Sequence, residues 1–157
     1  MVVKIYEPND VINMIGVRFE VRNNSVRFFT AHLKQCSVNS RDTIQDQFEE
    51  IRTQFRQATK SYEAMLLVFD ANVHVGGRWI KGCQDNEDWG GKMLMEMVNE
   101  ESLTLINNMD ICKGIVTRVD PRNGTCTTLD LALCNSFMLT WFTWFTQFPI
   151  INTVISY

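Results

Sequence analysis

Apolar and polar residues alternate near the beginning of the chain. Between Met14 and Arg22 an apolar residue stands at every second position, which is the period of a strand with one face buried. The pair Asn23-Asn24 then supplies turn residues, and a second apolar run extends from Val26 to Leu33. The pattern predicts a β-hairpin, with Ile15, Val17, Phe19 and Val21 on the buried face of its first strand.

The period changes to that of a helix in the next segment. Asp42, with Gln45 three residues later, has the pattern of an N-terminal helix cap, and apolar residues then recur at helical spacing as far as Lys60. We interpret this stripe as the core-facing side of an amphipathic helix and not as a cofactor site. It consists of Ile44, Phe48, Ile51, Phe55 and Ala58.

Strands and helices alternate through the next part of the chain. An apolar run from Ala64 to Phe69 stops abruptly at Asp70, which is typical of a buried strand. A second helix is predicted from about Trp89 to Glu101. The alternation predicts an α/β fold in one domain, and 45% hydrophobic and 21% charged residues are ordinary for a globular protein. Further strands are predicted over residues 103–106 and 127–134.

Charge and cysteine usage narrow the classes of protein. The net charge is −3, and the 15 basic residues are scattered singly, so binding to a polyanion would depend on local geometry. The five cysteines show no zinc-binding spacing, and the chain does not start like a signal peptide. We therefore expect an intracellular protein, cytoplasmic or nuclear, with free thiols.

Polar side chains follow the strand that ends at Asp70. On an extended chain Asp70, Asn72 and His74 would point to the same side, at a sheet edge where binding sites usually form. Asp70 would then place a charge beside the amide of Asn72. A simpler interpretation of Asp-X-Asn is a capped turn. Three interpretations of His74 remain: a metal ligand, a proton shuttle or a residue with no functional role.

Three blocks of sequence occur in a characteristic order. The first is Leu-Val-Phe-Asp-Ala-Asn-Val-His-Val-Gly at residues 67–76; the second runs from Gly90 to Asn108; and the third leads from Gly114 to Leu133. The residue types of these blocks, their order and their separations resemble those of the endonuclease/exonuclease/phosphatase superfamily, especially its retrotransposon-type endonuclease branch. The resemblance covers roughly residues 14–136.

The resemblance implies a particular α/β fold, a partial four-layered α/β sandwich in which two packed mixed β-sheets are flanked by helices. Because the match begins at the family's middle strands, the fold would lack its first strands. The chain is therefore expected to be a retroelement-derived relative, truncated at both ends. Residues 1–136 would form the truncated domain, and residues 137–157 a divergent apolar tail.

The resemblance also implies a Mg²⁺-dependent phosphodiesterase that acts on DNA and uses no small-molecule cofactor. The family's catalytic aspartate, which orients or deprotonates the attacking water, matches Asp70, and Asp70 is also the candidate metal ligand. The phosphate-holding asparagine matches Asn72, and Asp130 matches an aspartate that orients a histidine. His32 stands where the family has a phosphate-contacting tyrosine, so His32 and His74 are the candidates for substrate binding.

Two members of that catalytic set have no counterpart in the chain. The metal-binding glutamate of the family's first strands is not matched, and no histidine follows His74 to pair with Asp130. Asp70 would bind Mg²⁺ weakly or not at all, because a hard cation needs several oxygen ligands. We therefore expect impaired catalysis, and whether the protein is an enzyme stays open. The alternative is a non-catalytic interaction module or a relic of the fold.

The chain after Asp130 carries no charged side chain. Aromatic residues recur at about three-residue spacing between Phe137 and Phe148, which predicts a helix with one apolar side. Interspersed threonines, Pro149 and the lack of flanking Lys or Arg argue against a membrane helix. We expect this tail to pack against a sheet and not to anchor the chain in a membrane. A membrane-tethered protein is the weakest alternative.

Overall fold

The main sheet is mixed and joins segments from both halves of the chain. The computed structural model describes residues 2–21, 23–35, 37–109, 117–122 and 124–146. In this part of the chain β3 and β4 pair in parallel, and all other neighbours in the sheet are antiparallel. Across the sheet the strands are β1 (Val2–Tyr6), β2 (Asn13–Val21), β3 (Asn24–His32), β4 (Ala64–Asp70), β8 (Asp130–Cys134) and β5 (Thr104–Leu105).

The predicted hairpin is confirmed as β2 and β3. The predicted buried face of β2 is wrong, because Ile15 is 50% exposed, whereas Met14 on the other face is buried in the main core. Asn23 lies in the turn with a φ of 68°, a left-handed conformation that asparagine tolerates better than most residues. Gly16 faces Phe29 across the hairpin, and a Cβ at Gly16 would collide with the Phe29 ring. Glycine therefore lets a large buried ring sit directly over the neighbouring strand.

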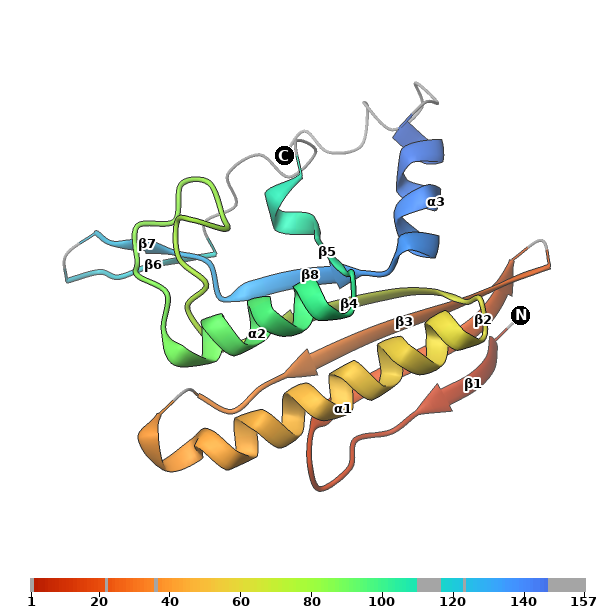
Figure 1. The fold of residues 1–157 in the computed structure, drawn as a ribbon, viewed down its shortest axis with the longest axis horizontal. Helices are drawn as coiled ribbons and strands as arrows, with labels where there is room; N and C mark the ends of the chain where they lie inside the picture. The colour runs from red at the N-terminus through yellow and green to blue at the C-terminus, as the bar shows by residue number, and fades with distance from the viewer. Residues whose placement is uncertain (1, 22, 36, 110–116, 123, 147–157) are drawn as a thin grey trace.

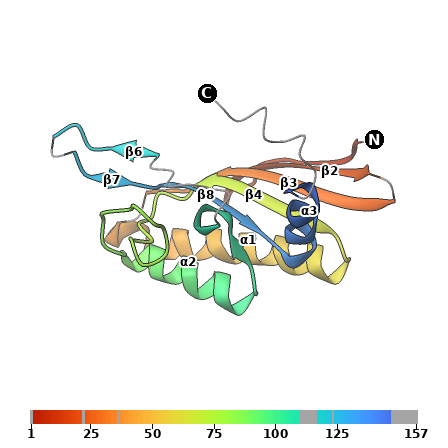
Figure 2. The same cartoon turned by 90° about the horizontal axis from the view of Figure 1, so that it is seen from above.

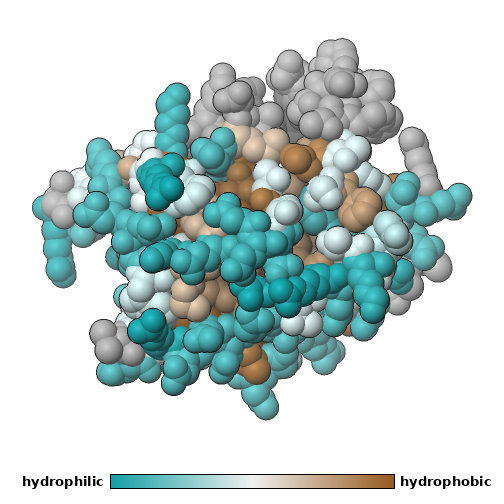
Figure 3. Space-filling model, viewed as in Figure 1, coloured by the Kyte–Doolittle hydropathy of each residue, from teal (hydrophilic) through white to brown (hydrophobic). Residues whose placement is uncertain are grey.

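The helices α1 (Arg41–Lys60) and α2 (Trp89–Glu100) cover one face of the sheet (Figures 1 and 2). Their apolar stripes and the facing strand residues form one continuous core, so the α/β prediction is confirmed. The outward side of this helix layer is mostly hydrophilic (Figure 3). The predicted cap is wrong, because α1 begins at Arg41 after Ser40, which places Asp42 in the first turn.

The start of α2 is fixed by a local cap. The Asp88 carboxylate accepts a hydrogen bond from the Gly91 N–H at 2.6 Å, which satisfies a free donor of the first turn. Gly91 packs directly on the backbone of His74, where any Cβ would collide with the carbonyl group. The helix can therefore lie flush against the segment that follows β4.

The predicted strand over residues 127–134 is divided in the structure. Thr127 belongs to a separate two-stranded sheet, and only the part from Asp130 onward joins the main sheet as β8. The predicted strand over residues 103–106 is shorter, because a 3-10 turn, η2 (Ile106–Asn108), replaces its end. The small sheet pairs β6 (Arg118–Val119) with β7 (Cys126–Thr127), and a further 3-10 turn, η1 (Val38–Ser40), precedes α1.

The third helix, α3 (Ser136–Thr146), lies on the sheet face opposite α1 and α2 (Figure 2). Asn135, which is buried, anchors its start by accepting hydrogen bonds from the N–H groups of Met65 and Met138 at 3.0 and 3.1 Å. The expected packing of this segment on a sheet is confirmed through Met138, which is buried against Val26 and Ala64. Within the described ranges, every helix is too short or too polar to span a bilayer. Residues 147–157 of the predicted tail lie outside the described residues.

Candidate functional site

Three polar residues occupy one register line where β3 and β4 end and β8 begins. His32 pairs with Asp70 across the parallel strands, and Asp70 pairs with Asp130 across the antiparallel strands. Residues that face each other in register project from the same side of a sheet. We call His32, Asp70 and Asp130 the edge row. The expected meeting of Asp70 and Asp130 at one edge of the sheet is therefore found.

Asn72 joins the edge row through its backbone and its side chain. Its N–H donates to Asp70 Oδ1 at 3.1 Å, and its Nδ2 donates to the Leu33 carbonyl oxygen at 2.8 Å. Nδ2 also lies 3.4 Å from His32 Nε2, a long contact for a hydrogen bond. Asn72 adopts a φ of 47°, so the Asp-Ala-Asn segment forms a capped turn and places both side chains beside His32.

The pair of His32 and Asp70 is open to solvent. His32 Nε2 lies 3.6 Å from Asp70 Oδ2, with exposed side-chain fractions of 64% and 34%. Solvent screens such a pair, so it adds little to stability. The same exposure leaves both groups accessible to a ligand.

Asp130 is positioned by contacts to its backbone. Thr117 Oγ1 accepts from the Asp130 N–H at 3.3 Å, and Asn107 Nδ2 donates to the Asp130 carbonyl oxygen at 3.1 Å. The chain contains two histidines, and both have other acidic partners: His32 lies beside Asp70, and His74 pairs with Asp85. Neither His32 nor His74 is therefore the histidine that Asp130 was expected to orient.

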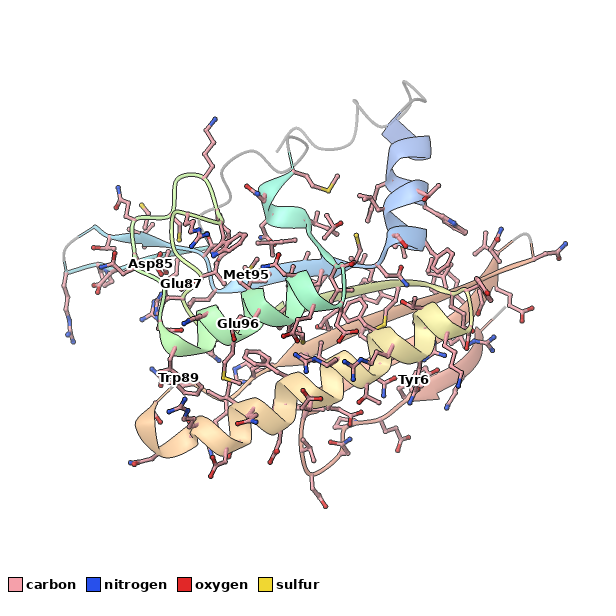
Figure 4. The ribbon with its side chains drawn as sticks, in the orientation of Figure 1. Tyr6, Asp85, Glu87, Trp89, Met95 and Glu96 are labelled. Atoms are coloured by element: carbon pink, nitrogen blue, oxygen red, sulfur yellow. The ribbon has the colours of Figure 1, made fainter. Side chains whose placement is uncertain are left out.

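His74 belongs to a different cluster. Its Nδ1 pairs with Asp85 Oδ2, and the thiol of Cys83 donates to the other oxygen of Asp85 at 2.6 Å. Figure 4 shows Asp85 on the loop that precedes α2. The expectation that His74 would face the same way as Asn72 assumed that the chain stays extended after Asp70. Instead, the strand ends at Asp70, and Asn72 adopts a left-handed backbone conformation. That expectation is therefore wrong.

The Cys83 thiol stays protonated in this cluster. Burial raises its pKa above the ordinary value, and the hydrogen bond to Asp85 raises it further. Cys83 therefore holds the Asp85 carboxylate in place as an S–H donor and is a poor nucleophile. Sequence reasoning did not find Asp85, because an acid in a Gly/Asp-rich loop carries no signal of its partner eleven residues away.

The edge row does not by itself make a magnesium centre. Among the described residues, no group of three or more His, Cys, Asp or Glu side chains is arranged to hold a metal ion. Asp70 contributes one carboxylate, and one of its oxygens already accepts the Asn72 N–H. Since Mg²⁺ requires near-octahedral oxygen coordination, these donors alone do not fit it.

Comparison with solved structures identifies the fold. The endonuclease domain of TRAS1, a telomere-specific non-LTR retrotransposon, has a TM-score of 0.55 at 16% identity, over 87% of this chain and 57% of its own. The fold of the chain is that of the endonuclease/exonuclease/phosphatase superfamily. Mannosyl-6-phosphatase Bt3783 of Bacteroides thetaiotaomicron shares this fold, with a TM-score of 0.51 at 15% identity over 78% of this chain and 42% of its own.

A humanized D. rerio TDP2 carrying 14 mutations shares the endonuclease/exonuclease/phosphatase fold as well, with a TM-score of 0.50 at 10% identity over 86% of this chain and 51% of its own. The chain thus spans about half the length of these structures. No family model matches the sequence, and neither does any curated protein.

Proposed function

We propose that the chain is an endonuclease-like domain of retroelement origin that binds DNA phosphodiesters at the edge row and hydrolyses them poorly or not at all. The observation that carries this proposal is the register line of His32, Asp70 and Asp130, with Asn72 folded back onto it. An exposed carboxylate beside an imidazole can accept a proton from water and pass it on. DNA is the partner, and the nuclease-like fold supports that choice.

The same geometry explains why hydrolysis should be slow. Attack on a phosphodiester builds negative charge on the phosphate oxygens, and preorganised donors or cations must stabilise it. At the edge row the available hydrogen-bond donors are His32 and the side-chain amide of Asn72. That amide already donates to the Leu33 carbonyl oxygen. Asp70 and Asp130 add two neighbouring negative charges. A bound divalent cation would offset that charge, and we propose that Asp70 holds one only weakly.

A nuclease assay tests the proposal. The purified chain, incubated with Mg²⁺ or Mn²⁺, should show no cleavage of plasmid or abasic DNA above background. Binding of a short abasic duplex, measured by fluorescence anisotropy, should weaken in His32→Ala. His74→Ala is the matched control, because it removes the chain's other histidine from the separate Asp85 cluster. Robust cleavage that is lost in Asp70→Ala would contradict impaired catalysis, and equal DNA binding in all variants would contradict the assigned site.

A second candidate function, a non-catalytic interaction module, is favoured by another feature of the same sheet. One of its faces carries exposed apolar side chains, among them Ile15 and Phe28. That face can bind a protein partner whether or not the edge row hydrolyses DNA.

A further inference from the structure

A cavity of about 290 Å³ lies between α1 and β1, the strand at one edge of the main sheet. That volume is close to the lower end of the range for small-molecule sites, which is about 300–1,000 Å³. Its floor is apolar, because Ile12, Met14 and Phe29 of the main core line it. None of the lining residues belongs to the edge row, so the cavity is a separate candidate site.

Aromatic rings form the β1 side of the cavity, where Figure 4 shows Tyr6 between β1 and α1. Tyr6 and Phe29 lie in register with Gly16 between them, and the missing side chain of Gly16 lets the two ring centroids lie 4.9 Å apart. The faces of aromatic rings carry negative potential and attract cations. The ammonium of Lys4 already lies 4.5 Å from the centroid of the Tyr6 ring, which is the contact that a ligand ammonium would make.

The α1 side of the cavity presents hydrogen-bond acceptors. Glu50 and Gln54 are one turn apart on the helix, and Gln54 Nε2 donates to Glu50 Oε1 at 3.0 Å. With the amide oriented in this way, Gln54 Oε1 is buried and has no hydrogen-bond partner within the described part of the chain. An unsatisfied buried acceptor is costly, and a ligand that carries a donor would remove that cost.

The charges around the cavity favour a cationic ligand. Glu49 pairs with Arg52 at 2.6 Å, whereas Glu50 forms no ion pair with any described residue. The lining includes a second acid, Glu7, and one base, Lys4. A half-buried carboxylate above an apolar floor attracts a cation more strongly than an exposed one does, because less water screens it. An anion would be repelled from the same position.

We propose that this cavity binds a small primary ammonium ion that carries a short apolar chain. The three N–H groups of the ligand match the Glu50 carboxylate, Gln54 Oε1 and the face of the Tyr6 ring, and its chain would cover the apolar floor. The volume restricts the ligand to a small molecule or a single side chain. Two sources carry such a group, a free amine and the lysine side chain of a peptide. The proposal goes beyond the DNA-binding site and does not depend on it.

Titration of the isotope-labelled full chain with n-butylammonium, followed through the amide NMR signals of Tyr6 and Gln54, tests the proposal. We expect saturation with a dissociation constant of about 5 mM, because a ligand of this size can bind only weakly. Butan-1-ol, which has nearly the same shape but no charge, should bind at least about fivefold more weakly. Nα-acetyl-lysine N-methylamide distinguishes the two sources. Binding tighter than that of butylammonium assigns the cavity to a peptide lysine, and weaker binding assigns it to a free amine.

Variants with opposite expected effects locate the site. Glu50→Gln should weaken butylammonium binding by about fivefold because it removes the attracting charge, and Lys4→Gln should strengthen it by about threefold because it removes a like charge from the Tyr6 ring. Glu49→Gln is the matched control, because it makes the same change at the adjacent position, where the acid pairs with Arg52. It should change the affinity by less than about 1.5-fold. Far-UV circular dichroism and the urea midpoint establish that each variant is folded.

Three outcomes would overturn the proposal. The signals of the wild-type chain could stay unchanged up to about 50 mM butylammonium, about ten times the expected dissociation constant. Butan-1-ol or butyrate could bind as tightly as butylammonium, or Glu49→Gln could weaken binding as much as Glu50→Gln does. Each of these results leaves the DNA-binding proposal intact, because that proposal is measured on the edge row.

Discussion

At the scale of single residues, the edge row places two carboxylates where a phosphodiester is proposed to bind. Asp70 and Asp130 face each other in register, and the imidazole of His32 lies beside Asp70. An anionic ligand is therefore repelled by the acids and attracted by the imidazole. The balance between these effects decides whether DNA binds without a divalent ion.

Asp70→Asn should strengthen DNA binding when no divalent ion is present. It removes one negative charge next to the phosphate and frees His32 from its acidic neighbour, and exposed charges of this kind contribute about 0.2–1 kcal/mol, or up to about fivefold in affinity. Anisotropy titrations at low salt with EDTA measure the change. Asp46→Asn, an equal change of charge on the exposed side of α1, should have less effect. Weaker binding in Asp70→Asn under these conditions would show that Asp70 contacts DNA as an acceptor.

Cys134 gives a prediction about pH. Burial raises the pKa of its thiol from the ordinary value of 9.0 to about 12. The unfolded chain therefore ionises this thiol at lower pH than the folded chain, so the contribution to stability is complete below pH 9 and is lost as pH rises from 9 toward 12. The urea midpoint of the wild-type chain should fall over this window more than that of Cys134→Ala. Parallel pH profiles for the two proteins would contradict the assignment.

At the scale of elements, a buried ion cluster joins three strands. Glu63, which precedes β4, accepts hydrogen bonds from Arg18 of β2 at 2.6 Å and from Arg27 of β3. Burial alone would raise the pKa of Glu63, but the two arginines hold it below the ordinary value. The carboxylate therefore remains charged and fixes the start of β4 beside the hairpin.

Glu63→Gln should lower the free energy of unfolding by about 3 kcal/mol, because it leaves the buried guanidinium of Arg27 without a full counter-charge. Urea denaturation at pH 7 measures the loss. Glu49→Gln removes an exposed acid of α1 that pairs with Arg52, and it should change stability by less than about 0.5 kcal/mol. Since the pKa of Glu63 is lowered, the wild-type advantage is complete above its ordinary value of 4.5 and is lost as pH falls through its folded pKa. An advantage that does not decrease at all as pH falls below 4.5 would rule out this explanation.

The elements differ in how far the sequence could predict them. The hairpin and α1 follow from strict periods of two and 3.6 residues, so local pattern was sufficient to place them. It did not identify the buried face of β2, because Ile15 is exposed and Met14 is buried. β1 was missed because five residues that include Lys4 show too little alternation. The meeting of Asp70 and Asp130 was predictable from strand ends, whereas the position of His74 was not. The turn at Asn72 and the partner Asp85 depend on backbone conformation and on contacts distant in sequence.

At the scale of the whole molecule, the sheet has two unequal sides. α1 and α2 bury one side completely enough to form the main core, while α3 protects only one end of the other. The boundary predicted between the domain and the tail, at residue 137, falls within the contact between α3 and the sheet. It lies next to the buried Asn135 that anchors the helix. The stability of the folded chain should therefore depend on α3.

Deletion of residues 137–157 tests whether the tail is a separate unit or part of the core. Because Met138 is buried against Val26 and Ala64, its loss should uncover apolar surface, lower the urea midpoint and increase binding of the dye ANS. Met138→Ala should reproduce part of this loss, about 2 kcal/mol, whereas Thr140→Ala, at an exposed position of the same helix, should cost less than about 1 kcal/mol. The three proteins are compared by urea denaturation and ANS fluorescence. A shortened chain that is equally stable and more soluble would instead support the division into residues 1–136 and a dispensable tail.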